Sequence, residues 1–488
     1  MSDNDLPTAL GNLALETAAE ADSHTPANPT VPYYSPNIQQ AFGSETQPSP
    51  LPEAGQAYAD IGYAFDEAKY LARSEARLRA GGLPTELPPG WPQALEGPLV
   101  WTSSDFPDED VYIYHLTDQD KAEINDALAH FKTLNKTGRH VNKESFPLPT
   151  LGEKLLRIKD DVYEGRGFAV LRGLDVDAYG KVDLVTVYLG LTSYVAEVRG
   201  KQNQQGEMLI HVVNTSETIQ HENATTNMPY HTDLVCDVVA TLTKSCGASG
   251  GTPALASVFT VYNELAATRP DLIHVLAEPN WPFDTYHRDP PFYYRALLYH
   301  LSNGRIALQF SRRTLVGHAA TSPDPTGAAR SPGIPGLTEA QAEALDALHA
   351  IGLKHEVKVP MQRGDIRFVN NLALMHRRDK YEDGGDDDDV GDGDGGGRRH
   401  LMRLWLHNPE ACWPLPPALK LAWERVFADQ EREERWELLV VEEGTGRLCV
   451  KRIWKEGDDD DGEGQEGLCS GENLEPACAA AHPVTACD

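Results

Sequence analysis

The chain has 488 residues, 40% of them apolar, so it can bury a large core in one domain or in several. Its formal net charge of -31 argues against nucleic acid and anionic membranes as partners. Much of that charge is local, because residues 382–394 hold eight acidic side chains and residues 456–466 hold seven. Such runs are typical of solvated segments without regular structure.

Targeting signals are not evident in the sequence. The first lysine or arginine is Lys69, whereas secretory and organelle transit peptides need such residues near their start. No run of about 18 or more apolar residues predicts a transmembrane helix. The seven cysteines show no CxxC spacing, which indicates free thiols rather than a zinc site or a disulfide framework. We therefore expect a cytoplasmic protein.

The N-terminal third is predicted to be irregular and helical. Residues 1–55 are rich in Pro, Ser, Thr and Asn, which predicts a disordered arm. Helices are expected over 63–80 and over 118–134, the second with Asp118 as its N-cap. Together with a proline-rich loop, these helices would form an extension over 56–160.

From residue 161 to 437 the sequence is dominated by short strand signals, which are runs of apolar and β-branched residues bounded by turn residues. Strands are expected over 167–173, 207–213, 234–243, 305–310, 355–359, 365–370 and 400–406, and helices over 180–198, 259–276, 338–352 and 418–436. This pattern predicts a mainly β fold with helical decoration (α+β), an antiparallel jelly-roll barrel, with a sandwich as the alternative. A β-hairpin over 438–455 and a disordered acidic tail over 456–488 are expected to follow.

A His-x-Asp pair at His231 and Asp233 is the first sign of chemistry. Where a strand gives way to a bend, both side chains can turn toward one ion. With a distant second histidine they would form the facial triad of non-haem iron, which leaves coordination positions open. A second pair occurs at His287 and Asp289, but two prolines follow it, whereas Asp233 runs into a predicted strand. The sequence therefore favours His231.

Two further signals lie near the C-terminal end of the strand-rich region. In the first, a Gly-Asp turn at Gly364 starts a strand, and His376 follows its end. In the second, Arg399 and Arg403 share one face of an expected strand. Two arginines that face a barrel interior need anionic partners. A dicarboxylate cosubstrate or acidic side chains of the protein could supply them.

Together these pieces resemble the taurine/2,4-dichlorophenoxyacetate dioxygenase family of 2-oxoglutarate-dependent oxygenases. The resemblance covers roughly residues 160–410, and the pieces occur in the family's order: His-Thr-Asp at 231–233, Gly-Gly at 250–251, Gly-Asp-Ile through Asn-Asn to His at 364–376, and Arg-x3-Arg at 399–403. It implies a double-stranded β-helix (jelly-roll) fold, in agreement with the expected strands.

The resemblance also implies an activity. His231, Asp233 and His376 would bind Fe(II), and 2-oxoglutarate would be the cosubstrate. The enzyme would use O2 to hydroxylate a small organic molecule, with release of succinate and CO2. The oligomeric state is left open, with a homo-oligomer as one option. The alternative is a non-catalytic jelly-roll protein that binds a metal or a ligand, for which a closed site would be more suitable than an open triad.

For the cosubstrate, the resemblance implies that Arg399 holds the distal carboxylate of 2-oxoglutarate. Arg403 matches an arginine that lies near the acidic group of anionic substrates, although it could take the cosubstrate role instead. Thr252 would contact 2-oxoglutarate, one residue earlier than the family's hydroxyl residue. Arg399 lies 23 residues after His376, farther than in the family, and an inserted acidic Gly/Asp loop over 384–397 explains the difference, since such insertions cost little.

Overall fold

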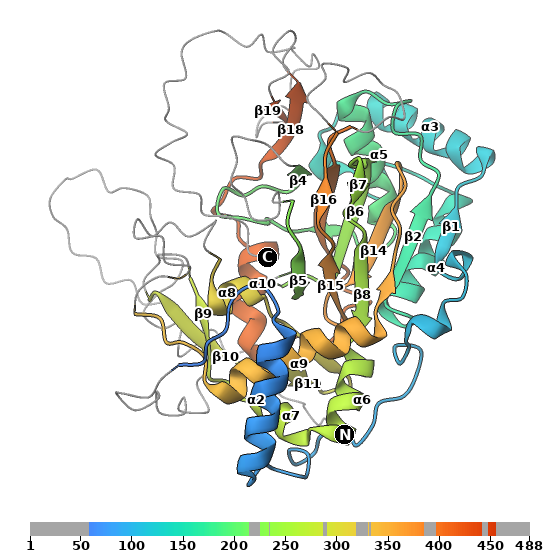
Figure 1. Cartoon of the computed structure of the whole chain (residues 1–488). Helices are drawn as coiled ribbons and strands as arrows, with labels where there is room; N and C mark the ends of the chain where they lie inside the picture. Colours follow the sequence, from blue (N-terminus) through green and yellow to red (C-terminus); the bar gives the residue numbers. More distant parts are fainter. Residues whose placement is uncertain are drawn as a thin grey trace, which may run out of the picture.

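The computed structural model describes residues 58–213, 225–233, 235–285, 290–318, 330, 333–384, 397–441 and 448–454. Two sheets form its centre (Figure 1). The larger sheet contains, in spatial order, β1 (Ile113–His115), β2 (Phe168–Arg172), β14 (Ile366–Asn370), β6 (Val238–Ser245), β17 (His400–His407) and β3 (Val198–Arg199), and β4 (Ile210–Val213) also pairs with β17. The smaller sheet contains β13 (Val357–Lys358), β8 (Pro253–Ser257), β15 (Leu374–Arg378) and β5 (Met228–His231).

Helices cover the outer faces of both sheets, so the architecture is mixed α+β. The α-helices are α2 (Glu67–Ala80), α3 (Asp118–Thr133), α4 (Leu151–Tyr163), α5 (Lys181–Ser193), α6 (Val258–Thr268), α7 (Pro270–Ala277), α8 (Arg312–Val316), α9 (Glu339–His355) and α10 (Lys420–Phe427). Helix α4 packs on the larger sheet, and α5 contacts it through the Tyr188 hydroxyl, which donates to the Met402 carbonyl of β17. Helix α3 packs against α5. Helices α6 and α9 pack on the smaller sheet, and helix α7 packs against α6 and α9.

The remaining elements are short. Two-stranded sheets are formed by β9 (Trp281–Asp284) with β10 (Phe292–Arg295), β11 (Leu298–His300) with β12 (Ile306–Leu308), β7 (Ser249–Gly250) with β16 (Tyr381–Glu382), and β18 (Trp436–Val441) with β19 (Leu448–Trp454). The 3-10 helices are η1 (Ser103–Asp105), η2 (Glu109–Val111), η3 (Gly138–His140) and η6 (Pro417–Leu419). Within the described ranges, no helix has both the length and the apolar character needed to cross a bilayer.

Alternation along each strand separates a helix-facing core from an inner surface. On β14, Ile366 and Phe368 join the core beneath α3, α4 and α5, whereas Arg367 and Val369 line a cavity between the sheets. Strand β17 repeats this pattern, since Leu404 packs toward the helices. The residues on the inner faces of the two sheets are therefore free of the helix-facing core and line the cavity between the sheets.

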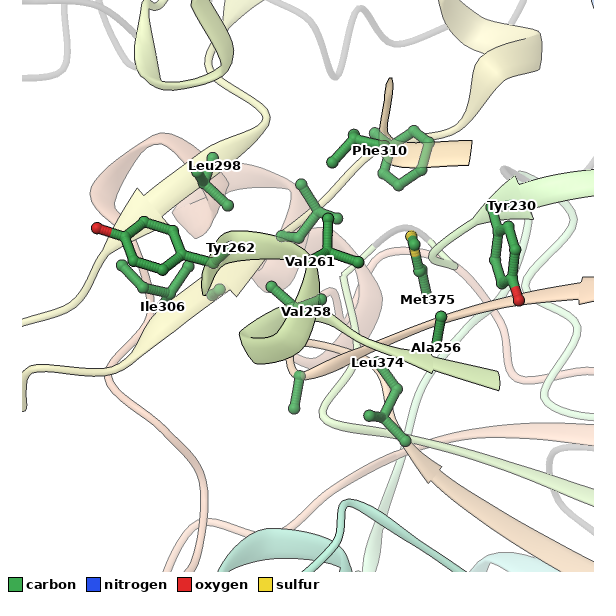
Figure 2. Packing of buried hydrophobic residues seen from close by; sticks show 14 of the residues in the cluster. Tyr230, Ala256, Val258, Val261, Tyr262, Leu298, Ile306, Phe310, Leu374 and Met375 are labelled. Atoms are coloured by element: carbon green, nitrogen blue, oxygen red, sulfur yellow. The ribbon is translucent and has the colours of Figure 1, made fainter. Parts of the chain in front are cut away.

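The core behind the smaller sheet is built around α6. Figure 2 shows Tyr262 of α6 beside Leu298 and Ile306 of the β11–β12 pair, while Val258 lies near Leu374 of β15. All five side chains are buried. This packing fixes β8 and β15, and therefore the smaller sheet, against a rigid helical layer.

Several of the expected helices differ from those observed, the first two at their ends. The N-cap of α3 is Thr117 rather than Asp118, because the Thr117 hydroxyl accepts a hydrogen bond from the backbone N–H of Asp120. The single helix expected over 259–276 is two helices, α6 and α7. Pro270 lacks a backbone N–H, so it cannot continue α6, and it begins α7 instead.

The helix expected over 180–198 is shorter, since α5 spans Lys181–Ser193. It ends at Ser193, and every residue from Leu184 to Ser193 is buried, because the helix lies between the larger sheet and other helices. Likewise, the helix expected over 418–436 ends at Phe427.

The strand expected over 234–243 begins four residues later, at Val238, because the chain bends after Asp233 before it enters β6. Several other expectations lie outside the described residues. They are the N-terminal arm over 1–55, most of the acidic loop (385–396), the second His-x-Asp pair at His287 and Asp289, and the acidic tail over 456–488.

Gly364 provides a test of the packing at the start of β14. Its φ is +84°, and an added Cβ would collide with the carbonyl oxygen of Leu174. We expect Gly364→Ala to lower the free energy of unfolding by about 3 kcal/mol, from backbone strain plus the steric clash. Gly304 has a φ of +80° with open space around it, so Gly304→Ala should cost only about 1 kcal/mol. Urea unfolding of both variants measures the difference, and equal losses would contradict the packing described.

Candidate active site

His231 and His376 lie opposite each other on neighbouring strands. His231 is the last residue of β5, and His376 is its register partner on β15. Cross-strand partners share one face of a sheet, and here the ring centroids are 4.3 Å apart. Nδ1 of His231 donates a hydrogen bond to the carbonyl of Pro229 (2.8 Å). Because that carbonyl can only accept, Nδ1 carries the proton and Nε2 offers its lone pair.

Asp233 joins the two histidines from the connection that follows β5. Its Oδ1 lies 3.4 Å from Nε2 of His376 and 3.9 Å from Nε2 of His231. One ligand-type atom from each of the three residues lies within 4.8 Å of the other two. On a straight strand, residues two apart would lie in line along one face. The bend instead brings the carboxylate back over the histidine pair.

Hydrogen bonds to its backbone groups hold this bend in place. Asn371 accepts a hydrogen bond from the Asp233 N–H (2.8 Å) and donates one to the Asp233 carbonyl (2.6 Å). The Thr232 N–H donates to the carbonyl of Phe310 (2.9 Å). Val235 has a φ of +53°, which costs a β-branched residue about 1–3 kcal/mol. The bend is therefore strained, and surrounding contacts maintain it.

The second carboxylate oxygen of Asp233 is bound by side chains of β17. Trp405 donates its indole N–H to Oδ2 (2.6 Å), and Nη1 of Arg403 lies 3.4 Å from the same atom. Nε of Arg403 in turn donates to Oε1 of Gln202 (3.0 Å). These contacts orient the carboxylate so that Oδ1 faces the histidines.

A cavity of about 80 Å³ lies between the inner faces of the two sheets. Residues of both sheets line it: Val212, Met228, His231, Asp233, Val239, Thr241, Pro253, Leu255, Arg367, Val369, His376, Arg377, Arg378, Arg399, Leu401 and Arg403. The structure therefore brings together five of the six predicted site residues. Thr252 is not part of the lining, although its neighbour Pro253 is.

The cavity wall is unusually basic. The guanidinium carbons of Arg378 and Arg399 lie 4.7 Å and 5.0 Å from the ring centroid of Tyr381. Burial, followed by the repulsion from Arg378, lowers the pKa of Arg399 to about 9. An anion in this cavity would therefore meet a strong positive potential.

The glycine pair at 250–251 allows Arg399 to approach β8. Gly251 has a φ of +70°, and an added Cβ would lie 3.2 Å from Nε of Arg399. Thr252 uses its carbonyl to accept the N–H of Asp379 (3.1 Å). The conformation of this segment is thus adapted to the arginine.

Three residues at the site were not predicted from the sequence: Asn371, Trp405 and Gln202. For Trp405 a signal existed, because it alternates with Arg403 on the inner face of the expected strand. For Asn371 the signal was its position in the Asn-Asn step before His376. No local pattern indicated Gln202.

A second group of ligand-type side chains consists of Asp237, His407 and Cys412. Oδ2 of Asp237 accepts hydrogen bonds from the Tyr163 hydroxyl (3.1 Å), Nδ1 of His407 (2.8 Å) and the Asn408 N–H (3.0 Å). Three donors already satisfy this oxygen. We interpret the group as a hydrogen-bonded connection between α4, β6 and β17.

The donor set at His231, Asp233 and His376 fits Fe(II). Two imidazole nitrogens and one carboxylate oxygen are the ligands of the 2-His-1-carboxylate triad, which leaves positions open for small molecules. A closed tetrahedral site would need a fourth protein ligand. Among the described residues, no fourth histidine, cysteine or acid joins this group.

Comparison with known proteins identifies the family. The family described as "Taurine catabolism dioxygenase TauD, TfdA family" matches residues 114–405, more than half of the chain. The chain belongs to this family. It is therefore an oxidoreductase, a dioxygenase that depends on 2-oxoglutarate and Fe(II), as the sequence predicted.

Curated relatives agree with membership of the TauD/TfdA family. The taurine hydroxylase-like protein SAT17 of Stachybotrys chartarum is 31% identical over 359 residues, which are 70% of this chain and 87% of that protein. FR-33289 synthase of Streptomyces rubellomurinus is 25% identical over 330 residues, 64% of this chain and 90% of that protein. A solved asparagine oxygenase, in complex with Fe(II), 2S,3S-3-hydroxyasparagine and succinate, is 19% identical; the match covers 61% of this chain and 93% of that one, with a TM-score of 0.46.

The contact between Trp405 and Asp233 can be tested in isolation. Trp405→Phe removes the donor to Oδ2 and should weaken Fe(II) binding by about tenfold, because groups that orient a metal ligand contribute on that scale. The matched control is Trp413→Phe, which loses an indole hydrogen bond to the Tyr163 carbonyl instead. Anaerobic metal titration measures both variants. Unchanged affinity in Trp405→Phe, or equal losses in the two variants, would contradict the orienting role.

Proposed function

We propose that this dioxygenase hydroxylates a small organic molecule while it converts 2-oxoglutarate to succinate and CO2, with His231, Asp233 and His376 as the iron ligands. The observation that carries the proposal is the convergence of two imidazole nitrogens and one carboxylate oxygen at the wall of an arginine-lined cavity. We also propose that the two facing sheets form the double-stranded β-helix of the family.

Fe(II) bound there would supply a centre at which 2-oxoglutarate and O2 react. The chain's own residues prepare that centre. The Pro229 carbonyl fixes the tautomer of His231, and Trp405 directs Oδ1 of Asp233 toward the histidines. Apolar side chains, including Val369 and Leu255, also line the cavity, and an apolar lining strengthens the electrostatic interactions within it.

Arg399 is the arginine best suited to the distal carboxylate of 2-oxoglutarate. Its Nε and Nη1 are buried without a hydrogen-bond partner among the described residues. Within those residues, therefore, no acidic side chain of the protein acts as the anionic partner of these two nitrogens. Arg403 instead contacts Asp233 and Gln202. Arg403 would therefore orient the carboxylate of Asp233 that binds the metal. Because Asp233 and Gln202 already contact its guanidinium group, only the remaining part of that group is left for an anionic substrate.

Hydroxylation is favoured over mere binding. The alternative was a non-catalytic jelly-roll protein, but the chain belongs to a dioxygenase family, and its triad leaves positions open. The taurine hydroxylase-like name of the relative from Stachybotrys chartarum supports the same reaction type. The basic wall of the cavity favours a substrate with an acidic group. Thr252 is outside this wall and receives no role.

The metal assignment predicts a spectroscopic result. Anaerobic addition of Fe(II) and 2-oxoglutarate should give a weak visible charge-transfer band, because the cosubstrate chelates the metal. His231→Ala should abolish the band. The control is His407→Ala, which disrupts the second group around Asp237 and should leave the band intact. A band that survives in His231→Ala and disappears in His407→Ala would place iron at the other group.

Substitution of Arg399 and substitution of Arg403 should have different effects on binding. Arg399→Ala should raise the 2-oxoglutarate KM by about 30-fold or more, since it removes one partner of a buried charge pair. Arg403→Ala should mainly weaken Fe(II) binding, because it removes the cation beside Oδ2 of Asp233. Steady-state kinetics and metal titration measure the two effects. The opposite pattern would exchange the two roles.

A further inference from the structure

Arg367 is a cavity residue to which no role has yet been assigned. It lies on β14, between Ile366 and Phe368, which both belong to the core beneath the helices. Alternation therefore turns Arg367 to the inner face, where it lines the same cavity as His231 and Arg399. A long basic side chain at this depth needs an explanation, because burial lowers its pKa to about 10.

The arginines of the cavity wall differ in their partners. Arg377 is bound by Glu356 and Asp379, and Arg403 is bound by Asp233. In contrast, the side chain of Arg367 makes no hydrogen bond or ion pair with any described residue. Arg399 likewise forms no ion pair within the same ranges, and its Nε and Nη1 lack hydrogen-bond partners there.

Strand register places Arg367 in the same row of the inner face as Arg403. Arg367 on β14 pairs with Thr241 on β6, and Thr241 pairs with Arg403 on β17. The three residues form one row across the inner face, with the two outer α-carbons about 10 Å apart. The charge of Arg367 also contributes to the lowered pKa of Arg399, after burial and Arg378, so the two guanidinium groups lie within electrostatic range.

One ligand can satisfy both of the arginines that lack protein acids. A carboxylate has two oxygens with about four acceptor positions, so it can accept from two guanidinium groups at once. The cosubstrate carries such a group at the end remote from the metal. Leaving two cations at the cavity wall without an ion-pair partner would be costly, whereas sharing one carboxylate offsets that cost.

We propose that Arg367 is a second guanidinium for the distal carboxylate of 2-oxoglutarate and forms a two-arginine clamp with Arg399. The inference rests on the proposed function, since it assumes that the keto-acid end lies at His231, Asp233 and His376. The clamp makes the cavity selective for dicarboxylate 2-oxo acids. It also leaves the cosubstrate-free protein with two cations at the cavity wall that form no ion pair with a described residue.

Calorimetric titration of the Mn(II)-loaded full chain tests the clamp with two ligands. One is 2-oxoglutarate, and the other is 2-oxopentanoate, which has the same chelating end and chain length but a methyl group in place of the distal carboxylate. Arg367→Gln should weaken 2-oxoglutarate binding by about tenfold to a hundredfold, the scale of a charged hydrogen bond. Binding of 2-oxopentanoate should change by less than about twofold, because it does not reach the clamp.

Arg377→Gln is the matched control. Arg377 also lines the cavity, but Glu356 and Asp379 already bind its guanidinium, so its loss should not discriminate between the two ligands. Arg367→Lys keeps the charge without the planar fork, and it should give an intermediate loss for 2-oxoglutarate alone. The ligand-free Arg367→Gln protein should also unfold at the same temperature as wild type or a higher one, because a cation without an ion-pair partner is removed.

Two results would overturn the inference: unchanged 2-oxoglutarate affinity in Arg367→Gln, or equal losses for both ligands. If Arg367→Gln does not fold, the same comparison is made with Arg367→Lys. Failure of the proposed metal site has a different signature, because wild type would then bind neither 2-oxo acid in a metal-dependent way. If wild type binds both ligands and the Arg367 variants bind them equally well, only the clamp is refuted.

Discussion

The carboxylate of Asp233 lies against two histidine nitrogens only because the chain bends immediately after β5. Asn371 holds both backbone polar groups of Asp233, and Trp405 holds its second oxygen. The strained conformation of Val235 is part of the same bend. These contacts reach Asp233, which follows β5 of the smaller sheet, from the end of β14 and from β17 of the larger sheet, so the spacing of the sheets and the geometry of the triad depend on each other.

The division between the outer and inner faces of the sheets explains why this fold tolerates a charged interior. Outward-facing residues such as Phe368 and Leu404 pack against helices and supply the hydrophobic stabilisation. Inward-facing residues are then available for polar chemistry, and on three neighbouring strands they include Arg367 and Arg403. A cavity with more buried cations than acids is unfavourable when empty. It is favourable when an anionic cosubstrate enters, which couples stability to binding.

Local pattern predicted the features that depend on neighbouring residues. Alternation placed Arg399 and Arg403 on one face, and the bend at Asp233 followed from a His-x-Asp at the end of a strand. Partners distant in sequence could not be predicted, since Arg403 contacts Asp233 170 residues away and also contacts Gln202. The same limit explains α5, whose burial on nearly all sides depends on what packs around it. The jelly-roll topology and the domain boundaries remain predictions.

Anomalous diffraction at the iron absorption edge, from crystals grown anaerobically with Fe(II), tests the central claim most directly. The triad predicts one strong peak about 2.2 Å from Nε2 of His231, Nε2 of His376 and Oδ1 of Asp233. A peak between Asp237 and His407 instead, or no ordered iron near Asp233, would contradict it.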